Sequence, residues 1–226
     1  MPWTAAIIAG GSASRLGGRD KSSLLVGGRS ILERQLEVLR PLTDRILLVA
    51  NRPERFAPTR LPVVRDVVPG TGALGGIYTA LTAAATDYVL ALAADMPFLA
   101  GRFLEHLVSA AEAVDLAIPR SADGYQPLCA CYARTCVEPL RRRIAAGALR
   151  VQDLAAEVRA REIGPAEIAE YDPHGLLFFN VNTPADYERA ERLAERSERQ
   201  TDRIMRGGEP APGRADLPRE RTKQTR

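Results

Sequence analysis

The chain has 226 residues, of which 46% are hydrophobic and 26% are charged, and its formal net charge is +3 at pH 7. This composition is typical of a globular protein with one α/β domain, and it excludes a wholly disordered chain. No apolar run reaches the roughly 18 residues that a membrane-spanning helix needs, so we expect no membrane partner. The first residues, MPWTAAIIAGG, lack the basic start and cleavage site of a secretory signal, which predicts a cytoplasmic protein.

The positive charge is concentrated at the C-terminus. Residues 196–226 carry a net charge of +4, whereas residues 1–195 carry a net charge of −1. A body without a basic excess does not favour nucleic-acid binding. The last twenty residues contain almost no large apolar side chains and several Pro and Gly. We therefore expect one domain over residues 1–195 and a basic, disordered tail over residues 196–226.

Strand-like and helix-like segments alternate along the chain. Short apolar runs predict strands at residues 4–10, 45–51, 61–66, 88–95, 115–120, 127–133 and 176–182. Apolar residues spaced three and four apart predict helices at residues 30–42, 75–85, 102–114, 135–147 and 184–196. This order predicts a single-domain, three-layer, Rossmann-like α/β fold with a mostly parallel sheet and helices on both faces. Ligands of such sheets bind beyond the carboxyl ends of the strands.

Three cysteines, Cys129, Cys131 and Cys136, lie close together in the sequence. Their odd number fits a reducing compartment better than a disulfide framework. Cys129 and Cys131 alternate along a predicted strand, so their side chains share one face. Small buried core residues are therefore the better interpretation of these cysteines, ahead of a metal–thiolate site.

The segment after the first predicted strand has the composition of a phosphate-binding loop. In residues 7–21, IIAGGSASRLGGRDK, two glycine pairs leave backbone N–H groups uncovered, so the chain can wrap closely around an anion. The loop is not a P-loop, because Lys21 follows Asp20 and not Gly. Hydroxyl or cationic groups that can bind phosphate oxygens are contributed by Ser12, Ser14, Arg15 and Lys21.

Other predicted strands also end in polar side chains. Asp95 follows the apolar run YVLALAA, and a carboxylate at the end of a buried strand is costly unless it is paired or binds a metal. Beside a nucleoside triphosphate it would hold Mg²⁺, which bridges phosphate oxygens. The further polar residues at predicted strand ends are Asn51, Asp66, Asn180 and Asn182. Their convergence at one edge would outline a nucleotide site.

Residues 70–75, GTGALG, match the pattern G-x-G-x-x-G of dinucleotide-binding enzymes. This match leaves an NAD(P)-dependent oxidoreductase as a minor alternative. Arg65, Asp66 and Pro69 precede the glycines, however, and the tight strand-to-helix turn of that motif has no room for them. We expect instead a second loop, including Gly72, whose backbone passes close to a base or a sugar.

The motifs together resemble those of a known family. Residues 9–21 are similar to the signature L-A-G-G-x-S-x-R-M-G-x-D-K of molybdenum cofactor guanylyltransferases, the MobA group of nucleotidyltransferases. The resemblance covers residues 4–195, and its specific part is the combination of the first glycine pair with DMPFL and NVNTP. Further similar stretches are VANR (49–52), RDVVPGTGALGGIYTAL (65–81), AADMPFL (93–99), GYQPLCACY (124–132) and NVNTPADYERA (180–190).

The resemblance implies a nucleotidyltransferase fold and a reaction in which GTP and molybdenum-molybdopterin give the guanine dinucleotide cofactor and pyrophosphate, with Mg²⁺. It also implies cofactor-inserting proteins or molybdoenzyme apoproteins as further partners. By position, the resemblance implies that Lys21 binds the phosphates, Asp66 contacts guanosine and Asp95 ligates Mg²⁺. The remaining implied contacts are to the nucleotide from Ile8, Ala9 and Gly10, and to the pterin side of the site from Asn180 and Asn182.

The residues themselves predict the same mechanism. The terminal phosphate of molybdopterin is already anionic, so the difficulty is to bring it against a charged α-phosphate. Arg15, Lys21 and a metal ion on Asp95 would screen that repulsion, which makes these three the expected catalytic residues. The amides of Gly11 and Ser12 would add nucleotide contacts.

The sequence departs from the family signature at a few positions. Leu16 replaces Met, which is a mild apolar exchange. Val49 stands where some members carry Asn, so Asn51 is assigned to the nucleotide here. Two alternatives remain at this stage: transfer of CMP or a sugar nucleotide by an enzyme of the same fold, and a catalytically silent nucleotide-binding adaptor.

Overall fold

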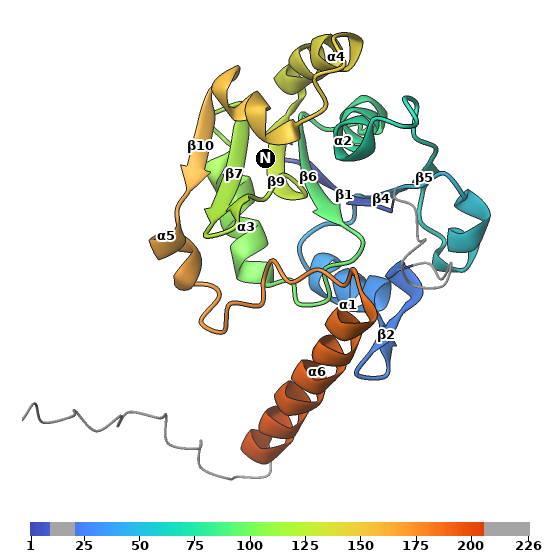
Figure 1. Cartoon of the computed structure of the whole chain (residues 1–226), viewed down its shortest axis with the longest axis vertical. Helices are drawn as coiled ribbons and strands as arrows, with labels where there is room; N and C mark the ends of the chain where they lie inside the picture. Colours follow the sequence, from blue (N-terminus) through green and yellow to red (C-terminus); the bar gives the residue numbers. More distant parts are fainter. Residues whose placement is uncertain (10–20, 206–226) are drawn as a thin grey trace, which may run out of the picture.

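A mixed sheet forms the centre of the chain. The computed structural model describes the backbone of residues 1–9 and 21–205 and the side chains of residues 1–9 and 22–196 (Figure 1). Within these residues the sheet has eight strands, with seven in the order β10-β7-β9-β6-β1-β4-β5 and β8 paired to β7. The strands are β1 (Trp3–Ile8), β4 (Ile46–Val49), β5 (Val63–Val64), β6 (Tyr88–Ala93), β7 (Leu116–Ser121), β8 (Gly124–Tyr125), β9 (Cys129–Ala133) and β10 (Ala160–Ile163).

The predicted three-layer α/β fold is confirmed. Strands β6, β1, β4 and β5 are parallel neighbours, and β9 runs antiparallel to β6 on one side and to β7 on the other. The long helices cover both faces of the sheet, as Figure 1 shows. They are α1 (Ile31–Leu39), α2 (Gly72–Ala83), α3 (Gly101–Ala110) and α4 (Val137–Ala145).

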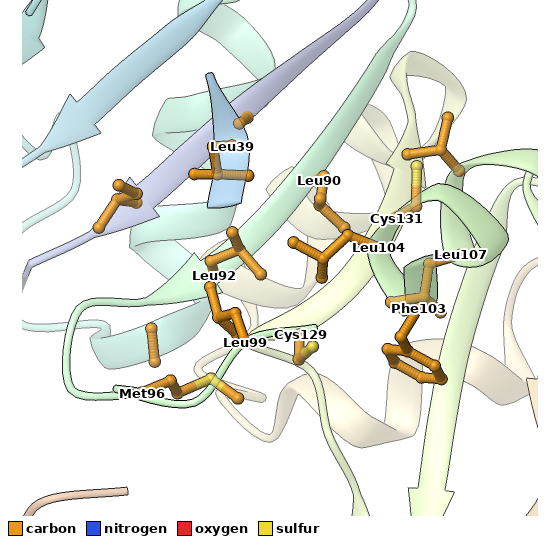
Figure 2. Packing of buried hydrophobic residues seen from close by; sticks show 14 of the residues in the cluster. Leu39, Leu90, Leu92, Met96, Leu99, Phe103, Leu104, Leu107, Cys129 and Cys131 are labelled. Carbon is orange, nitrogen blue, oxygen red and sulfur yellow. The ribbon is translucent and has the colours of Figure 1, made fainter. Parts of the chain in front are cut away.

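Alternation along the strands divides the core between the two faces. Ala5 and Ile7 of β1 pack with α1 and α3, whereas Ala6 and Ile8 pack with α2 and α4. Figure 2 shows the first of these clusters, to which α1 contributes Leu39, α3 contributes Phe103 and β6 contributes Leu90. The central strands β1, β4, β6 and β9 are therefore buried on both sides, which explains their nearly continuous apolar sequences.

The buried cysteines confirm the core interpretation. Cys129 and Cys131 lie on β9 in the α1 and α3 cluster, whereas the intervening Ala130 faces the opposite cluster. Burial raises the pKa of the Cys129 thiol to about 12, so the thiol stays protonated at neutral pH. These cysteines are apolar packing groups at the centre of the sheet.

The strand predicted at residues 176–182 is wrong. This segment has no strand, although it is apolar and partly buried. The side chain of Asp172 accepts hydrogen bonds from the backbone N–H groups of Leu176 and Leu177, at 2.8 and 2.9 Å, and so bends the chain into a turn. Phe178 and Leu177 then pack under the sheet without joining it. Burial alone produced the strand-like pattern.

Several short elements were not predicted. The two-stranded sheet of β2 (Leu25–Val26) and β3 (Arg29–Ser30), the edge strand β10 and the helix α5 (Pro165–Ala169) are too short to show a period in the sequence. The 3-10 turns are η2 (Lys21–Ser23), η3 (Pro53–Thr59), η4 (Arg134–Cys136) and η5 (Val151–Ala156).

The last helix, α6 (Pro184–Met205), packs its beginning against the β2–β3 hairpin and then leaves the body of the protein (Figure 1). Ala190 and Ala194 are buried there with Leu24 and Val26. The helix runs across residue 195, the expected end of the domain, and residues 206–226 of the expected tail lie outside the described part. Of the described helices, none is both long and apolar enough to cross a membrane.

Candidate active site

Four parallel strands end on the same level at one edge of the sheet. Ile8 is paired with Val49 and with Ala93, and Val49 is paired with Val64. Asn51, Asp66 and Asp95 each lie two residues beyond these positions, on three different strands. Neighbouring strands are about 4.8 Å apart, so the edge from β6 to β5 spans about 14 Å. The structure therefore brings these predicted site residues to one edge.

The expected phosphate loop starts at this edge. Ala9 directly follows β1, and its N–H donates to the carbonyl oxygen of Val49 at 2.9 Å. The chain returns to the described part at Lys21, the first residue of η2. The side chain of Lys21 lies outside the described residues, as do Gly10, Gly11, Ser12 and Arg15. Ile8 is buried and Ala9 is partly buried at the start of the loop.

Asp95 lies in a turn that is fixed through its backbone. The N–H of the preceding Ala94 donates to the carbonyl oxygen of Ile8 at 3.2 Å. The carbonyl oxygen of Asp95 accepts from the N–H of Val181 at 2.9 Å. The next residue, Met96, is 2% exposed and belongs to the same buried cluster as Leu92 and Leu99 (Figure 2). Asp95 itself is half-buried at the end of this anchored strand.

The segment with Asn180 and Asn182 lies beside the Asp95 turn. Val181, between the two asparagines, is fully buried and makes the backbone hydrogen bond to Asp95. The ring of Phe179 meets the ring of Phe98 edge to face, with centroids 5.8 Å apart. The side-chain amide of Asn180 donates to the carbonyl oxygen of Phe178 at 2.9 Å, and Asn182 is exposed. Residues 180–182 and 95–98 thus form one side of the site.

Asp66 organises the loop on the other side. Its Oδ1 accepts hydrogen bonds from the N–H of Val68 at 3.0 Å and from the hydroxyl of Thr79 at 3.1 Å. Thr79 is fully buried, and its hydroxyl oxygen in turn accepts from the N–H of Val67 at 3.1 Å. One oxygen of Asp66 therefore fixes the shape of the loop from residue 65 to residue 71, a role that its place after a strand did not reveal.

The N-terminus of α2 lies at the same edge. Residues 65–71 separate β5 from α2, so the tight turn of a dinucleotide-binding motif is absent there. Gly70 and Gly72 adopt positive φ angles of 90° and 63°, which favour glycine. Thr71, the N-cap, donates its hydroxyl to Val68 and does not cap the helix. The first-turn N–H groups therefore have no side-chain cap, an arrangement that favours an anion.

Close packing joins this helix to the first strand. A Cβ atom added to Gly76 would lie 2.6 Å from Cγ2 of Ile8, and one added to Gly75 would lie 2.1 Å from Oγ1 of Thr71. Both distances are far below van der Waals contact, and the β-branched Ile8 has little freedom to move its Cγ2. Glycine at these positions lets α2 approach the end of β1, where the expected phosphate loop begins.

We expect Gly76→Ala to lower the free energy of unfolding by about 1–3 kcal/mol, since the added methyl group overpacks the contact with Ile8. Chemical denaturation measures this change. Gly101→Ala is the matched control, because its Cβ would have only ordinary contacts, the nearest 3.7 Å from Val38. Equal stability of the two variants would contradict the proposed close packing.

Val49 and Asn51 differ in their access to a ligand. Val49 is 1% exposed within β4, so it belongs to the core. Asn51 is exposed just beyond the strand end. Of these two residues, only Asn51 has a side chain that is accessible at this edge.

The donor chemistry of the edge fits a hard divalent cation. Asp95 supplies a carboxylate, and the described residues contain no group of three or more His, Cys, Asp or Glu that could form a complete protein cage. Mg²⁺ is commonly held by one or two carboxylates together with phosphates and water. A single carboxylate beside the expected phosphate loop therefore suits Mg²⁺ or Mn²⁺ and not a structural zinc ion.

Gln35 is a site-related residue that the sequence analysis missed. It is 1% exposed on α1, and its Nε2 donates to the carbonyl oxygens of Ala93 at 2.7 Å and Met96 at 3.0 Å. These two residues flank the turn that carries Asp95. The available signal was a polar residue on the apolar face of the predicted helix, between Leu32 and Leu36.

Comparison with known proteins identifies the family. The family described as MobA-like NTP transferase domain matches residues 5–161. A protein of Desulfosudis oleivorans named molybdenum cofactor guanylyltransferase is 30% identical over 189 residues, 83% of this chain and 94% of that protein. A probable molybdenum cofactor guanylyltransferase of Chloroflexus aggregans is 36% identical over 192 residues, 82% of this chain and 92% of that protein.

A solved structure agrees with this assignment. The molybdopterin-guanine dinucleotide biosynthesis protein A of Archaeoglobus fulgidus superposes with a TM-score of 0.75 at 27% identity, covering 85% of this chain and 99% of that one. The glycine loop and the Asp95 turn lie within the residues that the family model matches. The chain is a nucleotidyltransferase that belongs to the MobA-like NTP transferase family.

Proposed function

We propose that the protein transfers GMP from GTP to molybdenum-molybdopterin, with Mg²⁺, to form the molybdopterin guanine dinucleotide cofactor and pyrophosphate. The relatives are named molybdenum cofactor guanylyltransferases, which implies nucleotide and molybdopterin substrates, and one solved structure of the same fold is a complex with manganese. The observation that most supports the proposal is the common level of the strand ends that carry Asn51, Asp66 and Asp95, next to the start of the glycine loop.

The reaction exchanges one phosphoanhydride bond for another. A terminal phosphate oxygen of molybdopterin attacks the α-phosphorus of GTP, the bond from that phosphorus to the bridging oxygen breaks, and pyrophosphate leaves with the electron pair. No general base is needed, because the attacking phosphate is already ionised. The protein must instead hold two anionic groups in line and stabilise the charge of the leaving group.

The residues of the edge divide this work between two sides. Asp66, Asn51 and Gly72 would contact the nucleoside on the β4–β5 side, together with Ile8 and Ala9. Asp95 would hold Mg²⁺, which screens the phosphate charges when it is bound.

The expected phosphate loop and the segment around Val181 complete the proposed site. The loop amides of Gly10, Gly11 and Ser12, with Arg15 and Lys21, would bind the phosphates. Asn180 and Asn182 would lie toward the pterin, since Val181 joins their segment to the Asp95 turn. Delivery of the product to a cofactor-inserting protein or to an apoenzyme would follow.

Two measurements test the proposal. Calorimetry with GTP, CTP, ATP and UTP in the presence of Mg²⁺ should show the tightest binding for GTP. Pyrophosphate release should then require GTP, Mg²⁺ and molybdenum-molybdopterin together. Tight binding of CTP with none of GTP would overturn the choice of base, and absence of product with both substrates present would favour a silent nucleotide-binding adaptor.

A further inference from the structure

We propose that Gln35 is a positioning residue that holds the Asp95 turn in the shape needed to bind the divalent metal ion. This inference rests on the proposed function, because it gives Asp95 the role of metal ligand. Gln35 does not itself touch the ligand in this proposal. It acts through the backbone on either side of Asp95.

Two side-chain hydrogen bonds of Gln35 are directed at the turn. Its Nε2 donates one hydrogen bond to the carbonyl oxygen of Ala93, the last residue of β6, and another to that of Met96. One amide group therefore clamps the two ends of the short segment that contains Asp95. The clamp fixes the direction in which the chain leaves the strand.

Two further hydrogen bonds complete the restraint. The N–H of Ala94 is bound to Ile8 of β1, and the carbonyl oxygen of Asp95 is bound to the N–H of Val181. Hydrogen bonds thus join the turn to β1, to the 180–182 segment and, through the side chain of Gln35, to α1. Of these three restraints, only the one from α1 is made by a side chain, so it can be removed without changing a backbone N–H group.

The position of Gln35 is costly for stability, which points to a role other than packing. It lies in the buried face of α1 with Ile31, Leu32, Leu36 and Leu39, where an apolar residue would be expected. Its Oε1 is buried and has no hydrogen-bond partner among the described residues. A buried acceptor without a partner is unfavourable. The side chain is therefore suited to donating to the turn and not to filling the core.

A helix is a rigid support for such a clamp. α1 begins with a full capping box, in which Ser30 and Glu33 satisfy each other's backbone N–H groups, and its first residue donates to the carbonyl oxygen of Leu24 at 3.0 Å. The N-terminal end of α1 is therefore fixed by hydrogen bonds. Groups that orient a metal ligand typically change metal affinity about 10–100-fold when they are removed.

The test uses Gln35→Met, which keeps the length of the side chain and removes both donors. Calorimetry gives the Kd of GTP in excess EDTA and the Kd of GTP in saturating Mg²⁺. The quantity compared between variants is the ratio of the first Kd to the second. We expect the ratio to fall about tenfold in Gln35→Met. The Kd in EDTA should stay unchanged.

Gln35→Glu provides a graded variant. Its shape is nearly the same, and burial favours the protonated carboxyl, which retains one donor. We therefore expect its ratio to lie between those of the wild type and Gln35→Met. If the ratio of Kd values in Gln35→Glu equalled that in Gln35→Met, the position of the Asp95 turn would not depend on the number of hydrogen-bond donors at residue 35.

Arg134→Met is the matched control, because Arg134 also donates to two backbone carbonyl oxygens, those of Ala84 and Thr86, at the opposite end of β6. It should lower the thermal midpoint without changing the ratio. If Gln35 acts through Asp95, adding Gln35→Met to Asp95→Asn should produce no further loss in the ratio. A further loss of the same size would show that Gln35 acts elsewhere.

Amide hydrogen exchange gives a readout that needs no nucleotide. Gln35→Met should speed exchange in the peptide that contains residues 94–98, and Arg134→Met should not. Unchanged exchange in Gln35→Met would overturn the inference alone. A wild-type protein that binds GTP equally well with and without Mg²⁺ would overturn both the proposed function and the inference.

Discussion

Asp95→Asn is expected to lower the rate of Mg²⁺-dependent pyrophosphate release by about 10²–10³-fold, the usual loss when a charged transition-state contact is removed. The substitution keeps the size of the side chain and takes away its charge. It also keeps the hydrogen bond from Val181, because that bond is made to the backbone of Asp95. The loss should therefore reflect the metal site and not the fold.

Asp87→Asn is the control for this variant. Asp87 directly precedes β6, at the end of the strand opposite to Asp95, and is exposed. Both variants should unfold near the wild-type temperature in thermal denaturation, and only Asp95→Asn should lose activity. An Asp95→Asn enzyme with wild-type turnover and an unchanged Mg²⁺ requirement would remove Asp95 from the proposed mechanism.

Lys21→Ala is expected to reduce kcat/KM for GTP by about 10²–10³-fold, because it removes a positive charge from the expected phosphate loop. Lys21 is the first described residue after that loop, and it begins η2 directly before β2. Lys21→Arg should retain part of the activity, since it keeps the charge but changes its shape and hydration. Steady-state kinetics at several GTP concentrations measures both effects.

Arg45→Ala separates this local effect from a change in net charge. Arg45 is exposed and forms an ion pair with the adjacent Asp44. It lies just before β4, at the end of the strand opposite to the candidate site. Its removal should leave kcat/KM unchanged. Equal losses in Arg45→Ala and Lys21→Ala would indicate long-range attraction of the nucleotide in place of direct binding.

The sequence predicted the elements with a strong internal pattern. The buried strands β1, β4, β6, β7 and β9 and the four long helices on the sheet were found because their apolar residues recur with a clear period. The segment at 176–182 had the same apolar content but no period that could separate a strand from a buried turn. Its conformation depends on Asp172, whose hydrogen bonds to Leu176 and Leu177 have no local sequence signature.

In the candidate site, too, some features could be predicted from the sequence and others could not. The polar residues after strands could be recognised because the ends of parallel strands meet at one edge. Their hydrogen bonds could not be, since the partners of Asp66 and of the Asp95 turn come from distant parts of the chain: Thr79, Val181 and Gln35. Such contacts follow from tertiary packing, which single-residue patterns do not encode.

The hydrogen bond between Val181 and Asp95 has a consequence for the order of folding. A growing chain is synthesised from its N-terminus, and its early parts can fold before its late parts leave the ribosome. All the strands of the sheet precede residue 164, whereas the partner of Asp95 comes only at residue 181. The sheet can therefore assemble first, and the turn at Asp95 gains its last restraint only when the C-terminal segment arrives. A newly made chain would thus assemble its sheet before the turn proposed to bind the metal ion is complete.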